Sequence, residues 1–192
     1  MTKIYFIRHA QSDNKNSDNR NRPLTEKGMV DRKLVTDFLQ DKSIDIVLSS
    51  TFKRAIDTVK PFAISQGLEI ELIEDFRERE ADWMPDIADF YTFAKRQWSD
   101  FSYALPGDEN LTDVQTRNIA AFKNVLEKYK DKNIAIGTHG TALSTIINYY
   151  DKSYGYDDFV AMVDMLPWAV LMEFDGQNCK NIQKINLFEV QP

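Results

Sequence analysis

Cysteine and histidine are both scarce in this chain, which has one cysteine and two histidines among its 192 residues. The single cysteine, Cys179, excludes a disulfide within the chain and agrees with a reducing compartment. With so few thiolate and imidazole ligands, a zinc site would have to be built mainly from carboxylates. We therefore expect no metal site.

Long apolar runs are missing as well, because the longest extend over about four to six residues, whereas a membrane-spanning helix needs roughly 20. The first run, IYFI at residues 4–7, is too short for the core of a signal peptide, and no small-residue cleavage pattern follows it. We therefore expect a cytoplasmic protein with no membrane partner.

An excess of positive charge is also absent, since 24 basic and 30 acidic residues give a net charge of −6. A nucleic-acid surface neutralises phosphates with clustered lysine and arginine, so we expect no nucleic-acid partner. A small anionic substrate would need a local basic pocket in this acidic chain. Arginines near the ends of predicted strands and helices are the first candidates for such a pocket.

What the chain does have is an alternation of short apolar strands with longer amphipathic stretches, which is typical of an α/β domain with a mostly parallel sheet. The length fits one domain over residues 1–192. Strands are predicted at residues 3–7, 44–48, 69–73, 133–137, 169–174 and 181–187. Helices are predicted at residues 25–40, 51–66, 87–99, 112–129 and 141–149, with a short turn near 157–162.

Both histidines follow directly after predicted strands. His9 comes after IYFI and Arg8, and His139 comes after NIAIG and Thr138. In open α/β sheets, ligands bind at the carboxyl ends of the strands, so neighbouring strands would place both imidazoles in one pocket. A lone histidine could simply satisfy its hydrogen bonds at a strand end, but two in the same setting indicate a site. Arg8 adds a guanidinium group that matches phosphate or carboxylate.

A third predicted strand leads into a helix with a basic first turn. Ser49, Ser50 and Thr51 favour a helix start, and Lys53 and Arg54 follow. Positive charge is unfavourable at a helix N-terminus, and a bound anion would reverse that penalty. The simpler alternative is that Arg54 is only solvated.

An acidic segment, EDFRERE at residues 74–80, follows the predicted strand 69–73. One carboxylate there could donate a proton to a leaving oxygen, provided that burial or neighbouring negative charge raises its pKa. Glu78 and Glu80 are the two candidates, and the alternative is that both are ordinary surface residues.

In combination, these motifs resemble those of the histidine phosphatase superfamily, which includes the cofactor-dependent phosphoglycerate mutases. Arg8-His9-Ala10 resembles the Arg-His-Gly signature of the family, and PLTEKG at residues 23–28 resembles its PLTxxG segment. SSTFKRAIDT at residues 49–58 is similar to its S-x-x-x-R-A-x-x-T helix start, and Thr138-His139-Gly140 to its second histidine motif. PGDE at residues 106–109 resembles its PGGE segment.

The resemblance implies a role for each candidate residue. His9 would be the nucleophile that forms a phosphohistidine. Arg8, Arg54 and His139 would bind the phosphoryl oxygens, and His139 would also be a catalytic residue. Glu78 would be the general acid, because its sequence context, FRER at 76–79, resembles the L-x-E-R context of the family acid better than the context of Glu80 does. The resemblance implies no metal and no cofactor, because arginines and an imidazolium supply the positive charge.

The resemblance also implies a three-layer α/β/α sandwich with a mostly parallel central sheet and a cap insertion at about residues 77–110. The cap would determine the substrate specificity. Trp83 and Tyr91 could stack against that substrate, whereas Phe90, Phe93 and Trp98 are interpreted as packing residues of an amphipathic helix.

The leading interpretation is a phosphomonoesterase acting on a small phosphorylated substrate, in which water resolves the phosphohistidine. One alternative is a 2,3-bisphosphoglycerate-dependent phosphoglycerate mutase, although members of that branch are usually longer and more basic in the cap. Another is a non-catalytic module that binds a phosphorylated ligand. Ala10 motivates it, because alanine in place of the usual glycine resists a positive φ at a cost of about 1 kcal/mol.

Two further points stay open at this level. The loop with Asn14 to Asn21 follows the nucleophile and carries Arg20 and Arg22 nearby, and it either contacts the substrate or is solvated. The oligomeric state is also open, with a homodimer as one arrangement.

Overall fold

The computed structural model describes residues 1–81 and 87–190 of the chain. Six strands form one sheet in the order β3-β2-β4-β1-β5-β6. They are β1 (Thr2–Arg8), β2 (Ile46–Ser49), β3 (Ile70–Leu72), β4 (Asn133–Thr138), β5 (Trp168–Asp175) and β6 (Asn178–Ile185). The first four strands of that order are parallel, and β5 is antiparallel to both β1 and β6. The predicted α/β class with a mostly parallel sheet is confirmed.

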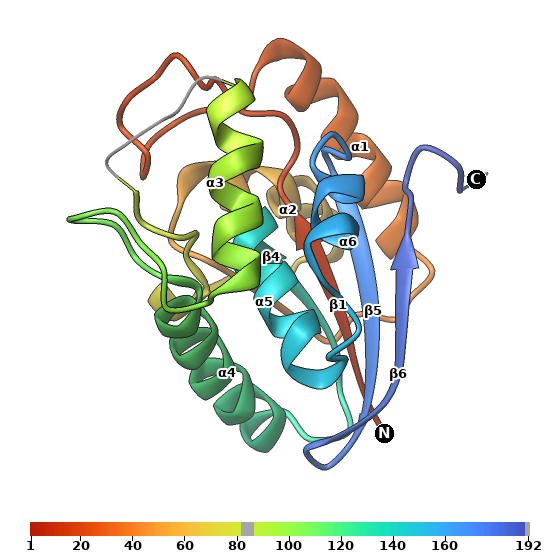
Figure 1. Cartoon of the computed structure of the whole chain (residues 1–192). Coiled ribbons are helices and arrows are strands. Elements are labelled where there is room, and N and C mark those ends of the chain that lie inside the picture. Colours follow the sequence, from red (N-terminus) through yellow and green to blue (C-terminus); the bar gives the residue numbers. More distant parts are fainter. Residues whose placement is uncertain (82–86, 191–192) are drawn as a thin grey trace.

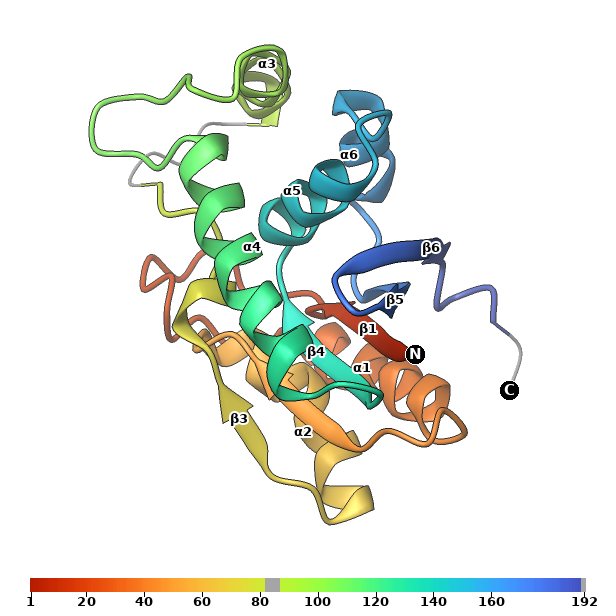
Figure 2. The same ribbon diagram turned by 90° about the horizontal axis from the view of Figure 1, so that it is seen from below.

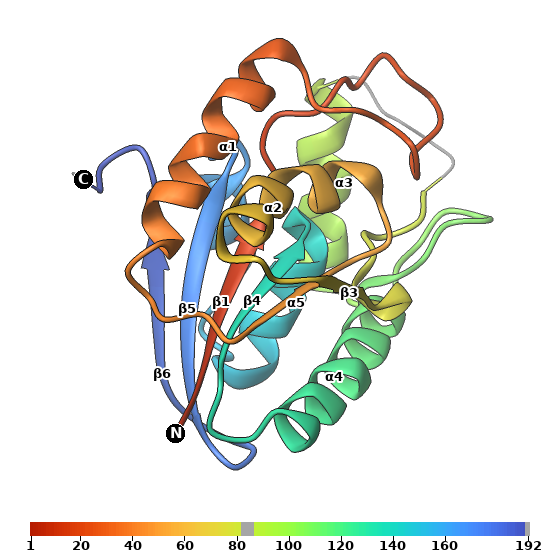
Figure 3. The same cartoon turned by 180° about the vertical axis from the view of Figure 1, so that it is seen from behind.

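Helices cover both faces of the sheet (Figure 1, Figure 2). One face carries α1 (Glu26–Leu39) and α2 (Lys53–Gln66), which lie in front of the strands in Figure 3. The other face carries α4 (Leu111–Lys128) and α5 (Gly140–Tyr150), with α3 (Ile87–Ser99) and α6 (Tyr156–Met162) beside them. The sandwich thus has the three layers that the sequence led us to expect. In the described parts of the chain, no helix is both long and apolar enough to span a membrane.

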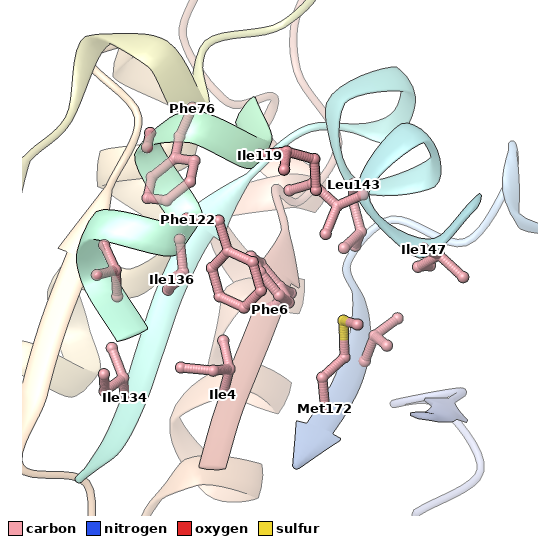
Figure 4. Close-up of a cluster of buried hydrophobic side chains, with 14 of the residues drawn as sticks. Ile4, Phe6, Phe76, Ile119, Phe122, Ile134, Ile136, Leu143, Ile147 and Met172 are labelled. Carbon is pink, nitrogen blue, oxygen red and sulfur yellow. The ribbon is translucent and has the colours of Figure 1, made fainter. Parts of the chain in front are cut away.

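The strand β1 is buried on both of its faces. Ile4 and Phe6 belong to the cluster of side chains under α4 and α5, where the rings of Phe6 and Phe122 lie 5.1 Å apart between centroids (Figure 4). Tyr5 and Ile7 belong to the cluster under α1 and α2. A strand covered on both faces reads as a continuous apolar run, which IYFI supplies. Each such side chain contributes roughly 1.5–3 kcal/mol when fully buried.

The last two strands differ from the sequence prediction at their connection. Gly176 has a φ of 60°, which allows a tight turn at Gly176-Gln177, and pairing resumes between Asp175 and Asn178. The strand β6 therefore begins at Asn178, three positions before the predicted start at Asn181. The short turn predicted near 157–162 is the helix α6.

The helix α3 lies within the segment 77–110 that we predict to be a cap. The rings of Phe90 and Trp98 lie 6.3 and 5.6 Å from that of Phe159 in α6, and Phe93 is only 8% exposed. The interpretation of these three aromatic residues as packing residues is therefore confirmed. The candidate Trp83 lies outside the described residues, and the capping role of the segment stays a prediction.

Candidate active site

Four strand ends meet at one edge of the sheet, because β3, β2, β4 and β1 are consecutive neighbours and run parallel. Arg8 pairs with Thr138 at the last register position of β1 and β4, so His9 and His139 leave neighbouring strands at the same level. Their imidazole rings lie 5.3 Å apart between centroids. The structure thus brings the two histidines of the chain into one site.

His9 is held in one orientation by two hydrogen bonds. Its Nδ1 lies 2.7 Å from the carbonyl oxygen of Ala10, which can only accept, so the neutral ring carries its proton on Nδ1. Nε2 then keeps its lone pair and accepts a hydrogen bond from Nε of Arg54 at 3.1 Å. This tautomer is inferred from the two partners. The ring therefore presents an unprotonated Nε2, as a nucleophile requires.

The charge state of His9 agrees with that tautomer. Burial lowers the pKa of His9 well below its usual range, and the positive charges of Arg54 and Arg8 lower it further. The bond to Ala10 acts in the opposite direction and is the weaker effect. His9 is therefore neutral at pH 7.

His139 is oriented by Ser50, in the segment that leads from β2 into α2. Its Nε2 lies 2.6 Å from the hydroxyl of Ser50, and that hydroxyl oxygen also accepts a bond from the backbone N–H of Phe52. The Ser50 hydroxyl therefore donates its proton to Nε2 of His139, so the proton of the neutral imidazole lies on Nδ1. Nδ1 is buried and has no partner among the described residues, so it is a free donor. Burial and then the charge of Arg54 lower the pKa of His139.

Arg54 lies in the first turn of α2 and is only 3% exposed. Besides its bond to His9, it donates from Nη1 to the carbonyl oxygen of Asn19 at 2.6 Å. Burial lowers the pKa of Arg54 to about 10. A buried guanidinium with these neutral partners is costly until an anion binds beside it.

Arg8 is anchored by carbonyl oxygens at the end of α6. Its Nη1 donates to Met162, Val163 and Met165, while its Nε is buried without a partner among the described residues. Burial lowers the pKa of Arg8 to about 10. Gly140 makes room for this group, because a Cβ there would lie 3.2 Å from Nε of Arg8.

Ala10 does not distort the site. Positive φ angles in the described residues occur at Ser43, Asp131 and three glycines, and Ala10 is not among them. Its backbone N–H donates to the hydroxyl of Thr58 at 3.0 Å, and that hydroxyl donates to the carbonyl oxygen of Arg54 at 2.7 Å. The strain expected for alanine at this position is therefore not present, because the backbone there has an ordinary φ.

Glu78 is placed at the start of α5, next to His139. Its two carboxylate oxygens accept hydrogen bonds from the backbone N–H groups of Arg79, Thr141 and Ala142 at 2.8, 2.9 and 3.0 Å. A carboxylate is favourable at a helix N-terminus. The negative charge of Glu78 also acts on Arg8 and Arg54, where it opposes the effect of burial on their pKa values.

Glu80, the other candidate acid, has a different environment. Its side chain is 49% exposed and forms ion pairs with Arg20 at 3.4 Å and Arg77 at 3.2 Å. The geometry therefore favours Glu78 as the carboxylate of the site.

A clamp that the sequence did not reveal holds the segment bearing Glu78. Arg117 of α4 binds both carboxylate oxygens of Glu109 at 2.7 and 2.8 Å, and it donates to the carbonyl oxygens of Asp75, Arg77 and Glu78. Glu109 also accepts from the backbone N–H of Glu80 at 2.9 Å. The PGDE motif thus has a structural purpose, because its Glu109 joins the acid-bearing segment to α4.

Within the described residues, no group of three or more His, Cys, Asp and Glu side chains is arranged as metal ligands. Among the described residues, the cations that act on His9 are the guanidinium groups of Arg54, Arg8 and, more weakly, Arg22. This arrangement can bind a small anion with a phosphorus atom in front of Nε2 of His9.

Comparison with known proteins agrees with this geometry. The family model of the histidine phosphatase superfamily (branch 1) matches residues 4–163. The uncharacterized phosphatase PhoE of Bacillus subtilis is 26% identical over 156 residues, which cover 77% of this chain and 76% of that protein. The 2,3-bisphosphoglycerate-dependent phosphoglycerate mutase 2 of Gloeobacter violaceus is 26% identical over 167 residues, covering 79% of this chain and 76% of the other.

A solved structure shares the fold over nearly the whole chain. The mycobacterial glucosyl-3-phosphoglycerate phosphatase is similar with a TM-score of 0.77 and 18% identity, over 96% of this chain and 98% of that chain. The family match and the named relatives confirm the expectation of an enzyme of the histidine phosphatase type. The chain belongs to the histidine phosphatase superfamily.

Proposed function

We propose that this protein is a phosphomonoesterase that hydrolyses a small phosphate ester, without a metal ion, through a phosphohistidine on His9. The observation that carries the proposal is the hydrogen bond from Nε of Arg54 to Nε2 of His9. It places the lone pair of a neutral imidazole beside a permanent cation. A phosphoryl group in front of Nε2 would meet positive charge where its own negative oxygens lie.

In the first step, Nε2 of His9 attacks phosphorus, and the bond between phosphorus and the ester oxygen breaks. The electron pair of that bond leaves with the oxygen, which takes the proton of Glu78, whose side chain enters this step as the neutral carboxylic acid. Arg8, Arg54 and the Nδ1–H of His139 hold the phosphoryl oxygens, where the charge is concentrated. The products of this step are a free alcohol and the phosphohistidine.

In the second step, a water molecule attacks the phosphohistidine. The carboxylate of Glu78 now takes a proton from the water, the bond between nitrogen and phosphorus breaks, and its electron pair returns to Nε2 of His9. Inorganic phosphate leaves, and the proton balance of Glu78 is restored. Two such steps have lower barriers than direct attack by water on the ester.

A mutase is the second candidate, because one of the relatives described above carries that activity in its name. The predicted cap at 77–110 contains eight acidic and four basic residues in the sequence, which suits a highly anionic bisphosphorylated substrate less well than a simple ester. Incubation with 3-phosphoglycerate and a trace of 2,3-bisphosphoglycerate separates the two functions. A mutase gives 2-phosphoglycerate, whereas a phosphatase gives inorganic phosphate.

A non-catalytic binding module is less well supported. Ala10 motivated this alternative, and it has an ordinary backbone conformation. The site also keeps Glu78 beside α5, and a proton donor has no use in a protein that only binds.

The proposal is tested by assaying hydrolysis of an aryl phosphate in excess chelator, with the wild-type protein and His9→Ala. We expect the wild type to be active in the chelator and the variant to lose activity by about three orders of magnitude. Equal rates in the two proteins would remove His9 as the nucleophile. Loss of wild-type activity in the chelator would contradict metal independence.

A further inference from the structure

A further buried guanidinium lies beside the site and has no role in the steps above. Arg22 closes the loop that follows His9, directly before Pro23, and it is only 9% exposed. The two ends of this loop are joined, because the N–H of Asp13 donates to the carbonyl oxygen of Pro23 at 2.9 Å and Ser12 forms a bridge with Leu24. Arg22 is therefore fixed close to the carboxyl end of β1.

Asn19 connects Arg22 with Arg54. Its side-chain oxygen accepts a hydrogen bond from Nη2 of Arg22 at 2.5 Å, and its backbone oxygen accepts one from Nη1 of Arg54 at 2.6 Å. Arg54 in turn donates to His9. The two guanidinium groups thus share Asn19 as a hydrogen-bond partner.

Among the described residues no carboxylate lies within ion-pair distance of Arg22, although the charges of Glu78 and Asp13 act on it at longer range. Within the described residues, its hydrogen bonds go to the neutral amide oxygens of Asn14 and Asn19, no carboxylate forms an ion pair with it, and its Nε is buried without a partner. Arg20, two positions earlier, is 52% exposed and pairs with Glu74 at 2.6 Å. A buried cation that is hydrogen-bonded only to neutral oxygens is costly even with Glu78 and Asp13 at longer range, and the charges of Arg22 and Arg54 also repel each other. A bound anion would remove both penalties.

The electrostatics of the neighbouring groups agree with this placement. Burial lowers the pKa of Arg54 to about 10, and the charge of Arg22 is the next largest cause. The low pKa of His9 has burial, Arg54 and Arg8 as its main causes, and Arg22 contributes as well. The charge of Arg22 is therefore felt at the ring that would carry the phosphoryl group.

We propose that Arg22 is a substrate-binding residue that holds the phosphoryl group together with Arg54, so that three guanidinium groups surround the phosphate. The identity of the ligand rests on the proposed function. A structural role, in which Arg22 only ties Asn14 to Asn19, explains the two contacts but not the buried charge. A neutral side chain could make such contacts without that cost.

The experiment measures the affinity of the full-length protein for inorganic phosphate by calorimetry and by the rise of the unfolding temperature with phosphate concentration. The variants are Arg22→Gln, Arg22→Lys and, as a matched control on the same loop, Arg20→Gln. We expect Arg22→Gln to weaken phosphate binding by about 10- to 100-fold and Arg22→Lys to recover part of the loss. Arg20→Gln should stay within about twofold of the wild type, because Arg20 is exposed and already paired.

The outcomes separate the two roles of Arg22. Unchanged phosphate affinity in Arg22→Gln overturns the proposal. Equal weakening in Arg22→Gln and Arg22→Lys, without recovery by the lysine charge, shows a structural role and also overturns it. The binding measurement does not depend on turnover. A protein that binds phosphate through Arg22 but hydrolyses no ester would therefore refute the proposed function and still support the role of Arg22.

Discussion

Nε of Arg54 lies 3.1 Å from Nε2 of His9, so a permanent cation donates a hydrogen bond to the atom that is to attack phosphorus. The same guanidinium lowers the pKa of His9, after burial, and that of His139, also after burial. Both imidazoles are therefore neutral under ordinary conditions. The pocket takes its positive charge from arginine, whose charge does not change over the physiological pH range.

Replacement of Arg54 by glutamine should shift the pH dependence of the reaction. Without that charge the pKa of His9 rises, so the nucleophile becomes protonated at a higher pH, and the acid limb of kcat/KM moves upward. The rate should also fall by about 10²- to 10³-fold, because one donor to the phosphoryl oxygens is lost. The measurement is a pH profile of kcat/KM for both proteins on the same aryl phosphate, so that the ionisation of the ester cancels.

The control for that experiment is Lys53→Gln, because Lys53 is the neighbouring cation but is exposed and forms an ion pair with Asp57. Its profile should match that of the wild type. An acid limb that stays in place in Arg54→Gln would show that Arg54 does not control the protonation of His9.

Replacement of Glu78 by glutamine should have an effect that depends on the leaving group. A poor leaving group such as an alkyl alcohol needs a proton from the acid, whereas p-nitrophenol leaves readily without one. We expect losses of about 10²- to 10⁴-fold on alkyl phosphates and much smaller losses on p-nitrophenyl phosphate. The matched variant Glu80→Gln should behave as the wild type on both, since Glu80 is exposed. A large loss on alkyl phosphates in Glu80→Gln, with none in Glu78→Gln, would show that Glu80 is the general acid.

Replacement of Arg117 by lysine should reduce kcat with little change in KM. Arg117 donates to the carbonyl oxygen of Glu78 and binds Glu109 through two bonds, and lysine cannot keep this geometry. We expect a loss of about 10-fold that is larger for alkyl than for aryl phosphates, as for Glu78→Gln. Lys123→Gln on the same helix is the control. Equal losses on both classes of ester would mean that Arg117 does not act through Glu78.

Replacement of Gly28 by alanine should destabilise the fold, although alanine favours helices by up to about 1 kcal/mol. A Cβ on Gly28 would lie 2.1 Å from the carbonyl oxygen of Gln11, so a backbone segment close to His9 would have to move. We expect a net loss of about 1–3 kcal/mol in the free energy of unfolding, measured with urea. At Gly155 the nearest atom would be 3.9 Å away, so Gly155→Ala is the tolerated control. Unchanged or higher stability of Gly28→Ala would disprove the contact.

Much of the site could be predicted from the sequence because its residues lie next to strand ends. An apolar run followed at once by Arg8 and His9, or by His139, is visible without knowing the fold. The parallel order of β1, β4 and β2 then brings these positions together with Arg54. For such residues, the local sequence pattern and the sheet topology are sufficient to predict a place in the site.

Other residues could not be found in this way because their contacts join distant parts of the chain. Arg117 is 39 positions from Glu78, and no local pattern in α4 indicates that its guanidinium reaches back to that segment. Arg22 lies in a loop rich in asparagine, where arginine is usually solvated, and its burial depends on Asn14 and Asn19 folding around it. The concern over Ala10 arose from a general preference for glycine, which this backbone does not require.

The central claim is that His9 carries the phosphoryl group during the reaction. The most direct measurement mixes the protein with a ³²P-labelled aryl phosphate, stops the reaction within milliseconds in alkali and locates the label by peptide mapping. We predict a label that is stable in alkali, labile in acid, located on His9 and absent from His9→Ala. A reaction that releases phosphate at the wild-type rate in His9→Ala, or a label on any other residue, would contradict the account.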